Sequence, residues 1–201
     1  KVLVTGATGF FGGAIARRLK NLGLPVIGQG RDYNNYKLLK TQGLECFRWN
    51  ISEPLSSEKQ DNLRDVSAVV HCAGLSSPVG SKDAFQTANV TGTINVLELA
   101  RKLNVKRFIY ISSPSVYFTL KDQLNVSEDY DLPKPFNQYA NSKVIAEKIV
   151  LKTPQVSPIV LRPRGIYGPG DRHLLPRLLK AAERRPLPKF RSGIAEIDLT
   201  Y

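Results

Sequence analysis

Short β-rich runs alternate with helical patterns along this sequence of 201 residues, and this alternation constrains the fold more than any other feature. Strands that alternate with helices pair in parallel through right-handed crossovers. The sequence therefore predicts an α/β fold in which helices cover both faces of a doubly wound parallel sheet. We expect strands at residues 1–5, 24–29, 44–49, 66–73, 107–112 and 156–161, and helices at 11–22, 83–103 and 138–151.

A glycine-rich segment, Thr5-Gly6-Ala7-Thr8-Gly9-Phe10-Phe11-Gly12, joins the first expected strand to the first helix. Gly6 permits a tight turn, Gly9 lets the backbone approach a pyrophosphate, and Gly12 lets helix and strand pack closely. The N-terminus of the helix offers free N–H groups and a partial positive charge to the phosphates. Because the segment follows a strand and opens a helix, it predicts a dinucleotide site in a Rossmann-type sheet.

The end of the second strand bears on the choice of dinucleotide. Such sites often place an acid there to hold the ribose 2′-hydroxyl. In the register we prefer, Gly30 takes the place of the acid and Arg31 follows, which suits a 2′-phosphate and predicts NADP. In a register shifted by two residues, Asp32 takes the role and favours NAD.

Two further motifs carry chemistry. In Tyr139-Ala140-Asn141-Ser142-Lys143 the tyrosine and the lysine are four residues apart and share one helix face. A free phenol has a pKa near about 10, and a neighbouring ammonium stabilises its phenolate. Such a tyrosine passes a proton to or from a substrate oxygen while hydride moves on a nicotinamide. The segment Ile111-Ser112-Ser113-Pro114-Ser115-Val116-Tyr117 follows the fifth strand, at the edge where ligands of such sheets bind.

Together, these motifs resemble the extended short-chain dehydrogenase/reductase family of the NAD-dependent epimerase/dehydratase type, over essentially the whole chain. The resemblance implies that Ser113, Tyr139 and Lys143 are catalytic and that Ser115 contacts the substrate. It gives Asn89 a structural role. The cofactor contacts that we expect are Gly6, Thr8, Gly9, Phe10, Phe11, Gly12, Arg31, Asn50, Ile51, Cys72, Ala73, Gly74, Tyr139, Lys143 and Arg162.

Within this family the serine segment separates several reactions. Dehydratases typically follow the catalytic hydroxyl with an Asp-Glu pair, whereas Pro114 and Ser115 stand here, which disfavours dehydration. The segments 112–116, 168–171 and 174–179 look most like the 3β-hydroxysteroid dehydrogenase-like branch and its ketone reductases. We therefore expect an oxidoreductase that transfers hydride between NADP(H) and a secondary alcohol or ketone.

Two alternatives stay open. The first is a UDP-sugar 4-epimerase, in which the cofactor is reduced and reoxidised within one turnover. Phe118 weakens it, because sugar epimerases often have glycine after Val-Tyr. The second is a regulator that binds the dinucleotide without catalysis, and the presence of both Tyr139 and Lys143 weakens it.

The resemblance also concerns organisation. We expect residues 1–201 to form the dinucleotide-binding domain. Residues 197–201 look like the segment that precedes a small C-terminal substrate domain, which we expect to be largely missing from this chain. The family further implies a homodimer through the helices at 83–103 and 138–151.

The formal net charge of +12 raises the question of a nucleic-acid partner. No helix-turn-helix, RNP-like or zinc pattern accompanies it, so we expect a solvated face and some phosphate contacts, with no nucleic acid bound. Much of the excess lies between residues 162 and 191.

The remaining composition points to an ordinary cytoplasmic protein. Cys46 and Cys72 lack metal-ligand spacing and predict reduced thiols, with no metal site. The longest apolar runs are too short for a membrane span, so no membrane partner is expected. We interpret His71 as a core histidine with satisfied hydrogen bonds rather than a catalyst.

Overall fold

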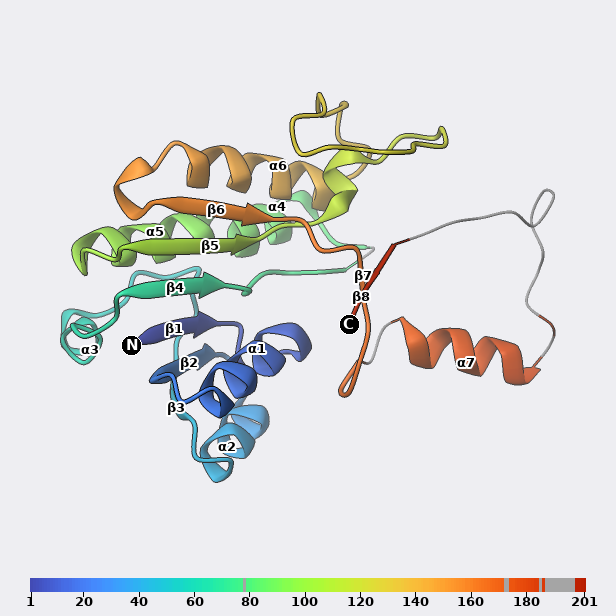
Figure 1. The fold of residues 1–201 in the computed structure, drawn as a ribbon. Coiled ribbons are helices and arrows are strands. Elements are labelled where there is room, and N and C mark those ends of the chain that lie inside the picture. Colours follow the sequence, from blue (N-terminus) through green and yellow to red (C-terminus); the bar gives the residue numbers. More distant parts are fainter. Residues whose placement is uncertain (78, 172–173, 185, 187–197) are drawn as a thin grey trace. The chain divides into compact units, whose positions relative to one another are not determined.

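The computed structural model describes residues 1–77, 79–171, 174–184, 186 and 198–201 (Figure 1). The chain divides into two compact units, Lys1–Arg162 and Pro163–Tyr201. Part of the cation-rich region expected between 162 and 191, namely 172–173, 185 and 187–191, lies outside the described residues, as does residue 197.

The first unit is built on a six-stranded sheet. All its neighbouring strands pair in parallel, in the order β3-β2-β1-β4-β5-β6, which confirms the predicted doubly wound fold. The order reverses between β1 and β4, and ligands of such sheets bind at the carboxyl ends of the strands next to that point. The strands are β1 (Val2–Thr5), β2 (Val26–Gly30), β3 (Glu45–Arg48), β4 (Ala68–His71), β5 (Arg107–Ile111) and β6 (Pro158–Leu161).

Helices cover both faces of this sheet. Figure 1 places α1 and α2 against one face and α5 and α6 against the other. Two short 3₁₀ turns, Pro114–Tyr117 and Pro154–Val156, follow β5 and α6. The helices are α1 (Phe10–Asn21), α2 (Tyr33–Thr41), α3 (Ser57–Asp61), α4 (Lys82–Phe85), α5 (Gly92–Lys102) and α6 (Gln138–Leu151).

The second unit contains α7 (Leu175–Arg184) and a parallel pair of two-residue strands, β7 (Gly165–Ile166) and β8 (Leu199–Thr200). The ring centroids of Tyr167 and Tyr201 lie 5.4 Å apart beside this pair.

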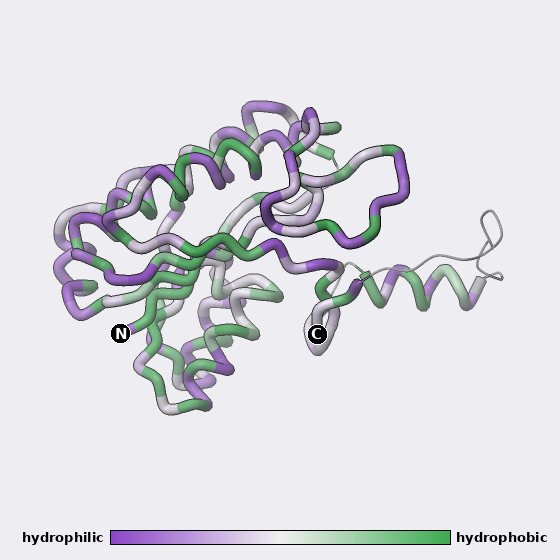
Figure 2. Tube along the Cα trace, turned by 45° about the horizontal axis from the view of Figure 1, so that its top comes forward, coloured by the Kyte–Doolittle hydropathy of each residue, from purple (hydrophilic) through white to green (hydrophobic). Residues whose placement is uncertain are grey.

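Two apolar clusters lie on opposite faces of the sheet. Successive residues of one strand alternate between them: Leu3 belongs to the cluster that α5 and α6 complete, and Val4 to the cluster that α1 and α2 complete. Val69 and Val70 of β4 divide in the same way. Strands that are buried on both faces read as continuous apolar runs, which Figure 2 shows as green central strands.

The sequence analysis missed α2, α3 and α7. The first four residues of α2, Tyr-Asn-Asn-Tyr, are not strong helix formers. The helix begins because the side chain of Asp32 accepts a hydrogen bond of 2.7 Å from the backbone N of Asn35, as an N-cap does.

The regular helix expected at 83–103 is also corrected. Its middle, Gln86–Thr91, is a π-helix between α4 and α5. The hydroxyl of Thr93 donates to the carbonyl of Asn89 at 2.6 Å, and such a bond competes with the α-helical ladder. The Asn89 side chain also bonds the backbone of Leu75, so a contact outside the helix helps to set this wider turn.

The packing predicts different costs for the same substitution at two leucines. Leu3 is fully buried on the central strand β1, whereas Leu120 is 92% exposed. We expect Leu3→Ala to lower the free energy of unfolding by about 2–5 kcal/mol, and Leu120→Ala to change it by less than about 0.5 kcal/mol. Urea unfolding measures both, and equal unfolding midpoints would contradict this account of the core.

Candidate functional site

The glycine loop leads from β1 into α1 at the carboxyl edge of the sheet. Gly6 has a φ of +69°, which favours glycine. A Cβ at Gly12 would lie 2.5 Å from the carbonyl oxygen of Gly6, so the start of α1 lies too close to the loop for any side chain. No side chain caps the first turn of α1 and no acidic residue lies in it. The turn is therefore suited to a phosphate.

A residue that the sequence analysis did not single out holds this loop. Gln29 on β2 is 2% exposed. Its Oε1 accepts a hydrogen bond of 3.0 Å from the backbone N of Gly6, and its Nε2 donates to the carbonyl of Trp49 at 2.5 Å. A lone amide within an apolar strand is the signal that could have identified it, because a buried polar side chain needs partners.

A cavity of about 550 Å³ adjoins the loop. Eight of the expected cofactor contacts line it: Gly6, Thr8, Gly9, Arg31, Ile51, Cys72, Ala73 and Gly74. Its other lining residues are Gln29, Gly30, Asp32, Ser52 and Ala88. The lining does not include the other seven expected contacts, which are Phe10, Phe11, Gly12, Asn50, Tyr139, Lys143 and Arg162. This groove fits a dinucleotide, because it lies at the switch point of the sheet, beside the glycine loop and the uncapped first turn of α1.

A neighbouring cavity of about 490 Å³ shares Arg31 and is also lined by Arg48 and Asn50. The Nδ2 of Asn50 donates to the side chain of Glu53 at 2.9 Å. Arg48 lies beside Gly30 in the sheet register, and its Nε donates to the carbonyl of Arg31 at 3.3 Å. Two arginines therefore flank the end of β2.

The end of β2 has no room for an acid at the preferred position. A Cβ at Gly30 would lie 2.2 Å from the side chain of Thr8. Asp32, the alternative, uses its Oδ1 to cap α2 through Asn35. Arg31 is exposed at the mouth of the groove.

Below the groove, a chain of hydrogen bonds includes His71, which is 1% exposed. The Thr93 hydroxyl donates to a carbonyl, so it accepts from His71 Nε2 at 3.0 Å, and Nδ1 then accepts from Thr5 Oγ1 at 2.6 Å. Burial, with the positive charge of Lys143 as a second cause, lowers the pKa of His71 to about 3. The imidazole is neutral and structural, as we expected.

The expected thiols are free. Burial raises the pKa of Cys72 to about 12, against the opposing charge of Lys143. Burial also raises the pKa of Cys46. Both side chains are protonated at neutral pH, and Cys72 contributes a neutral wall to the groove.

Lys143 on α6 reaches the end of β5. Its Nζ donates to the carbonyl oxygen of Ile111 at 2.7 Å and lies 4.4 Å from the centroid of the Tyr110 ring. Burial lowers the pKa of Lys143 to about 8, while the negative charge of Glu147 and the Cys72 thiol oppose that shift. The fold therefore brings a buried ammonium to the position where the serine segment begins.

The serine segment forms the 3₁₀ turn directly after β5. Ser113 Oγ accepts a hydrogen bond of 3.2 Å from the backbone N of Ser115. Within the described part of the chain, the buried hydroxyls of Ser112 and Ser115 have no hydrogen-bond partner. Unpaired buried hydroxyls are costly unless a ligand or water meets them.

Helix α6 packs on this turn and places the tyrosine. Val144 of α6 forms an apolar cluster with Val116 and Tyr117 of the turn. Tyr139 lies one helical turn before Lys143, and its ring centroid is 6.0 Å from that of Phe85 on α4. The expected catalytic residues thus come from two adjoining elements, β5 with its turn and α6.

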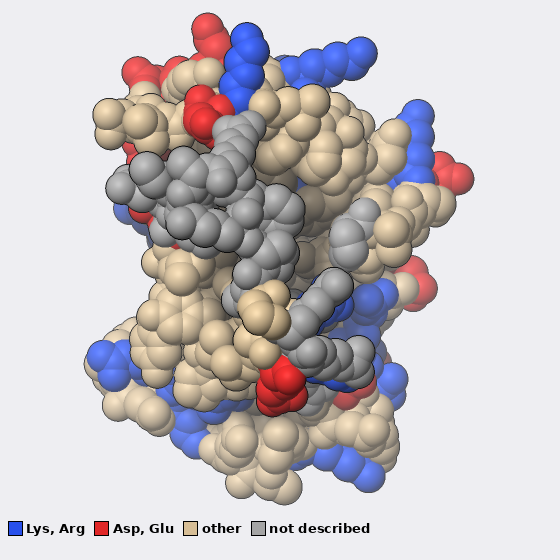
Figure 3. All heavy atoms as spheres, turned by 90° about the vertical axis from the view of Figure 1, so that its right-hand side faces the viewer, with Lys and Arg blue, Asp and Glu red and all other residues tan. Residues whose placement is uncertain are grey.

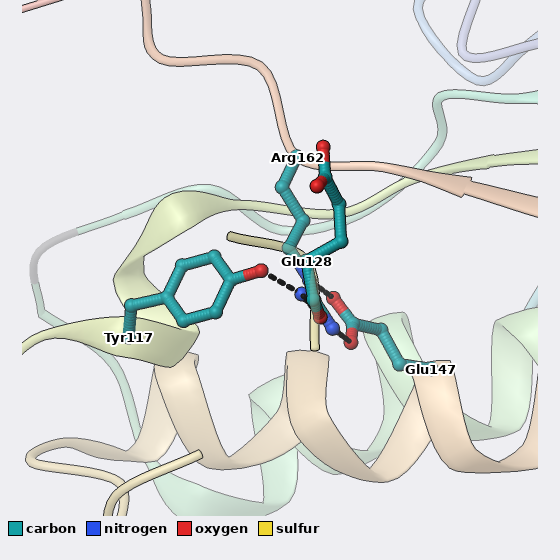
Figure 4. A network of polar contacts seen from close by, with 4 residues as sticks. All are labelled: Tyr117, Glu128, Glu147 and Arg162. Carbon is teal, nitrogen blue, oxygen red and sulfur yellow. Dashed lines mark hydrogen bonds and ion pairs between the residues drawn. The ribbon is translucent and has the colours of Figure 1, made fainter. Parts of the chain in front are cut away.

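Arg162, expected to contact the cofactor, bonds to three other residues of the chain (Figure 4). Its Nε and Nη2 donate to the two carboxylate oxygens of Glu147 at 2.9 and 2.6 Å. Its Nη1 donates to the hydroxyl of Tyr117 and to the carbonyl of Glu128. The sequence analysis did not find Glu147 or this network.

Charged side chains of both signs are present on the face drawn in Figure 3. On the face drawn in Figure 3, Lys and Arg side chains stand in separate groups among uncharged residues. None of the helices in the described ranges combines the length and apolar character that crossing a membrane requires.

Relatives with curated names match the chain over most of its length. A 2-alkyl-3-oxoalkanoate reductase of Stenotrophomonas maltophilia is 34% identical over 211 residues, which cover 100% of this chain and 61% of that protein. The sterol-4-alpha-carboxylate 3-dehydrogenase, decarboxylating, of Mus musculus is 32% identical over 212 residues, covering 100% of this chain and 56% of that protein. The chain thus spans somewhat over half the length of these curated relatives.

Solved structures share the fold. MoeE5 in complex with UDP-glucose and NAD is 31% identical, with a TM-score of 0.75, over 90% of this chain and 60% of that one. The glycine loop and the six-stranded sheet of the first unit agree with this similarity. The family described as NAD dependent epimerase/dehydratase matches residues 2–201, and the chain belongs to that family.

Proposed function

We propose that this chain is the dinucleotide-binding part of an oxidoreductase that transfers hydride between NADP(H) and a secondary alcohol or ketone. The observation that carries the proposal is the position of Lys143, whose buried ammonium donates to Ile111, two residues before Ser113. The groove beside the glycine loop supplies the dinucleotide site. The reductase and the sterol dehydrogenase named above support this reaction class.

The residues divide the chemistry in the following way. A bound nicotinamide supplies or accepts the hydride. In the reductive direction, the Tyr139 phenol gives its proton to the carbonyl oxygen, which becomes the hydroxyl, and leaves a phenolate. The ammonium of Lys143, one helical turn away, stabilises that phenolate. The hydroxyl of Ser113 hydrogen-bonds the substrate oxygen, and Ser115 adds a second contact.

Among the cofactor contacts, the residues that line the groove hold the adenosine and pyrophosphate portions. The first turn of α1, including Phe10, Phe11 and Gly12, offers its backbone N–H groups to the phosphates. Asn50 serves the adenine end, beside Arg31 in the neighbouring cavity. Tyr139 and Lys143 face the nicotinamide ribose.

The end of β2 supports NADP over NAD. An acid at position 30 would displace Thr8, and Arg31 offers a cation for a 2′-phosphate. The solved relative MoeE5 holds NAD. Within this chain the NAD reading requires Asp32, which already caps α2.

A second candidate is a UDP-sugar 4-epimerase. The solved structure of UDP-glucuronic acid 4-epimerase from Bacillus cereus, bound to UDP-glucuronic acid and NAD, supports it, with 26% identity and a TM-score of 0.73. An epimerase retains its cofactor and shows no net change in NAD(P)H. A regulator without catalysis would tolerate loss of Tyr139.

We also propose a homodimer through α5 and α6, a cytoplasmic location, and a separate substrate domain that complements residues 1–201. The family resemblance supports the dimer and the substrate domain, and the free thiols of Cys46 and Cys72 support the location. Ile145 and Ile149 on α6 are only partly buried, as a helix that meets a second copy requires.

Tyr139→Phe tests the catalytic assignment. Removal of the proton donor should lower kcat for ketone reduction by about 10²–10⁴-fold, while the affinity for NADPH stays within about twofold. The assay follows NADPH oxidation over a panel of ketones with the full-length protein. Tyr36→Phe, which removes a hydroxyl on α2, is the matched control and should leave kcat unchanged. A fully active Tyr139→Phe enzyme would falsify the assignment.

Arg31→Ala tests the cofactor. Loss of a charged hydrogen bond to the 2′-phosphate should weaken NADPH binding by about tenfold or more and leave NADH binding nearly unchanged. Fluorescence titration with both cofactors measures this, with Arg64→Ala on the exposed surface as the control. Tighter binding of NADH, unchanged in Arg31→Ala but lost in Asp32→Asn, would favour NAD instead.

A further inference from the structure

A largely buried ion pair joins the proposed catalytic helix α6 to the residue that follows β6. The carboxylate of Glu147 is 2% exposed and the side chain of Arg162 is 16% exposed. The guanidinium meets the carboxylate with two parallel hydrogen bonds, of 2.9 and 2.6 Å. Such a fork fixes orientation as well as distance.

The same guanidinium joins two further segments. Its Nη1 donates to the hydroxyl of Tyr117, and its central carbon lies 4.6 Å from the centroid of that ring. Nη1 also donates to the carbonyl of Glu128 at 3.3 Å. Figure 4 shows Arg162, at the end of β6, reaching the side chains of Glu147 on α6 and Tyr117 in the turn after β5, and the backbone of Glu128 in the loop that follows.

The positions of these contacts connect them to the proposed site. Tyr139, Lys143 and Glu147 occur at intervals of four residues on α6, so they follow one another along one face of the helix. Tyr117 ends the 3₁₀ turn that begins after Ser113. Arg162 therefore holds the element with the tyrosine and lysine against the element with the serines.

We propose that Arg162 and Glu147 are positioning residues that set the distance between the serine turn and the Tyr139–Lys143 face of α6. This role, rather than a cofactor contact, accounts for the hydrogen bonds of Arg162. The proposal rests on the proposed function in that Ser113, Tyr139 and Lys143 are the reacting groups.

Glu147 has a second effect on the same helix face. Its negative charge raises the pKa of Lys143 against the larger effect of burial. Glu147→Gln keeps the shape but removes this charge, so the ammonium would lose its proton at a lower pH. The other titratable groups around the Lys143 ammonium are His71 and Cys72 by β4, Tyr110 on β5 and Tyr139 on α6.

The test compares Arg162→Lys and Glu147→Gln with the corresponding changes in an exposed ion pair, Arg64→Lys and Asp61→Asn. The full-length protein is used throughout. For the buried pair we expect kcat to fall by about tenfold to a hundredfold, because small displacements of reacting groups are costly. The KM values and the cofactor Kd should stay within about twofold, and the exposed-pair variants should match the wild type.

Two further readouts separate positioning from mere stabilisation. In Glu147→Gln the basic limb of the kcat/KM profile should move to lower pH. The double variant should lose no more than the worse single variant, because the pair acts as a unit. Folded variants with wild-type kcat, or with raised cofactor Kd at unchanged kcat, would overturn the proposal.

Amide hydrogen exchange keeps the proposal independent of turnover. We expect faster exchange in residues 114–117 and 138–151 of Arg162→Lys than of Arg64→Lys. If the wild type reduces no ketone, the proposed function fails, and unchanged exchange would separately overturn the positioning role.

If both buried-pair variants fail to fold, Tyr117→Phe is the deciding variant. A fall of several-fold in its kcat supports the proposal, and an unchanged kcat overturns it.

Discussion

The burial of one ammonium group is the constraint on which the candidate site depends. Lys143 gives up most of its hydration inside the fold, and the Ile111 carbonyl and the Tyr110 ring replace only part of it. Its pKa falls to about 8 for this reason. The nearby carboxylate of Glu147 limits the fall in this pKa. The fold therefore holds a positive charge whose burial is unfavourable and whose pKa depends on its neighbours. Groups of this kind gather at functional sites.

A second set of buried polar groups holds the sheet and the helices in register below the groove. Thr5, His71 and Thr93 form a continuous chain of hydrogen bonds from β1 through β4 to α5. Asn89 extends it, since its Nδ2 donates to Ser142 Oγ on α6 at 2.9 Å. Satisfied networks of this sort specify one arrangement, because a shift of any member leaves a buried group without a partner.

The shape of the groove near the glycine loop is set by close contacts between chain segments more than by attractive interactions. Position 12 must be glycine because a Cβ there would clash with the backbone of Gly6. Position 30 must be glycine because a Cβ there would clash with the side chain of Thr8. Gln29 then fixes the loop from below through Gly6 and Trp49. These contacts leave the first turn of α1 open toward the groove, where the alignment of its N–H groups favours an anion.

The sequence alone determined what depends on local spacing: six parallel strands, a glycine loop before α1, and a Tyr139–Lys143 pair one helical turn apart. Each of these features is defined by residues a few positions apart in the sequence, so it can be recognised without coordinates. Only the tertiary structure decided which distant groups meet. The Arg162–Glu147 pair and the partners of the Gln29 amide come from other segments, and the π-helix at Asn89 depends on its bonds with Leu75 and Thr93. The spacing of residue types along the sequence does not predict such contacts.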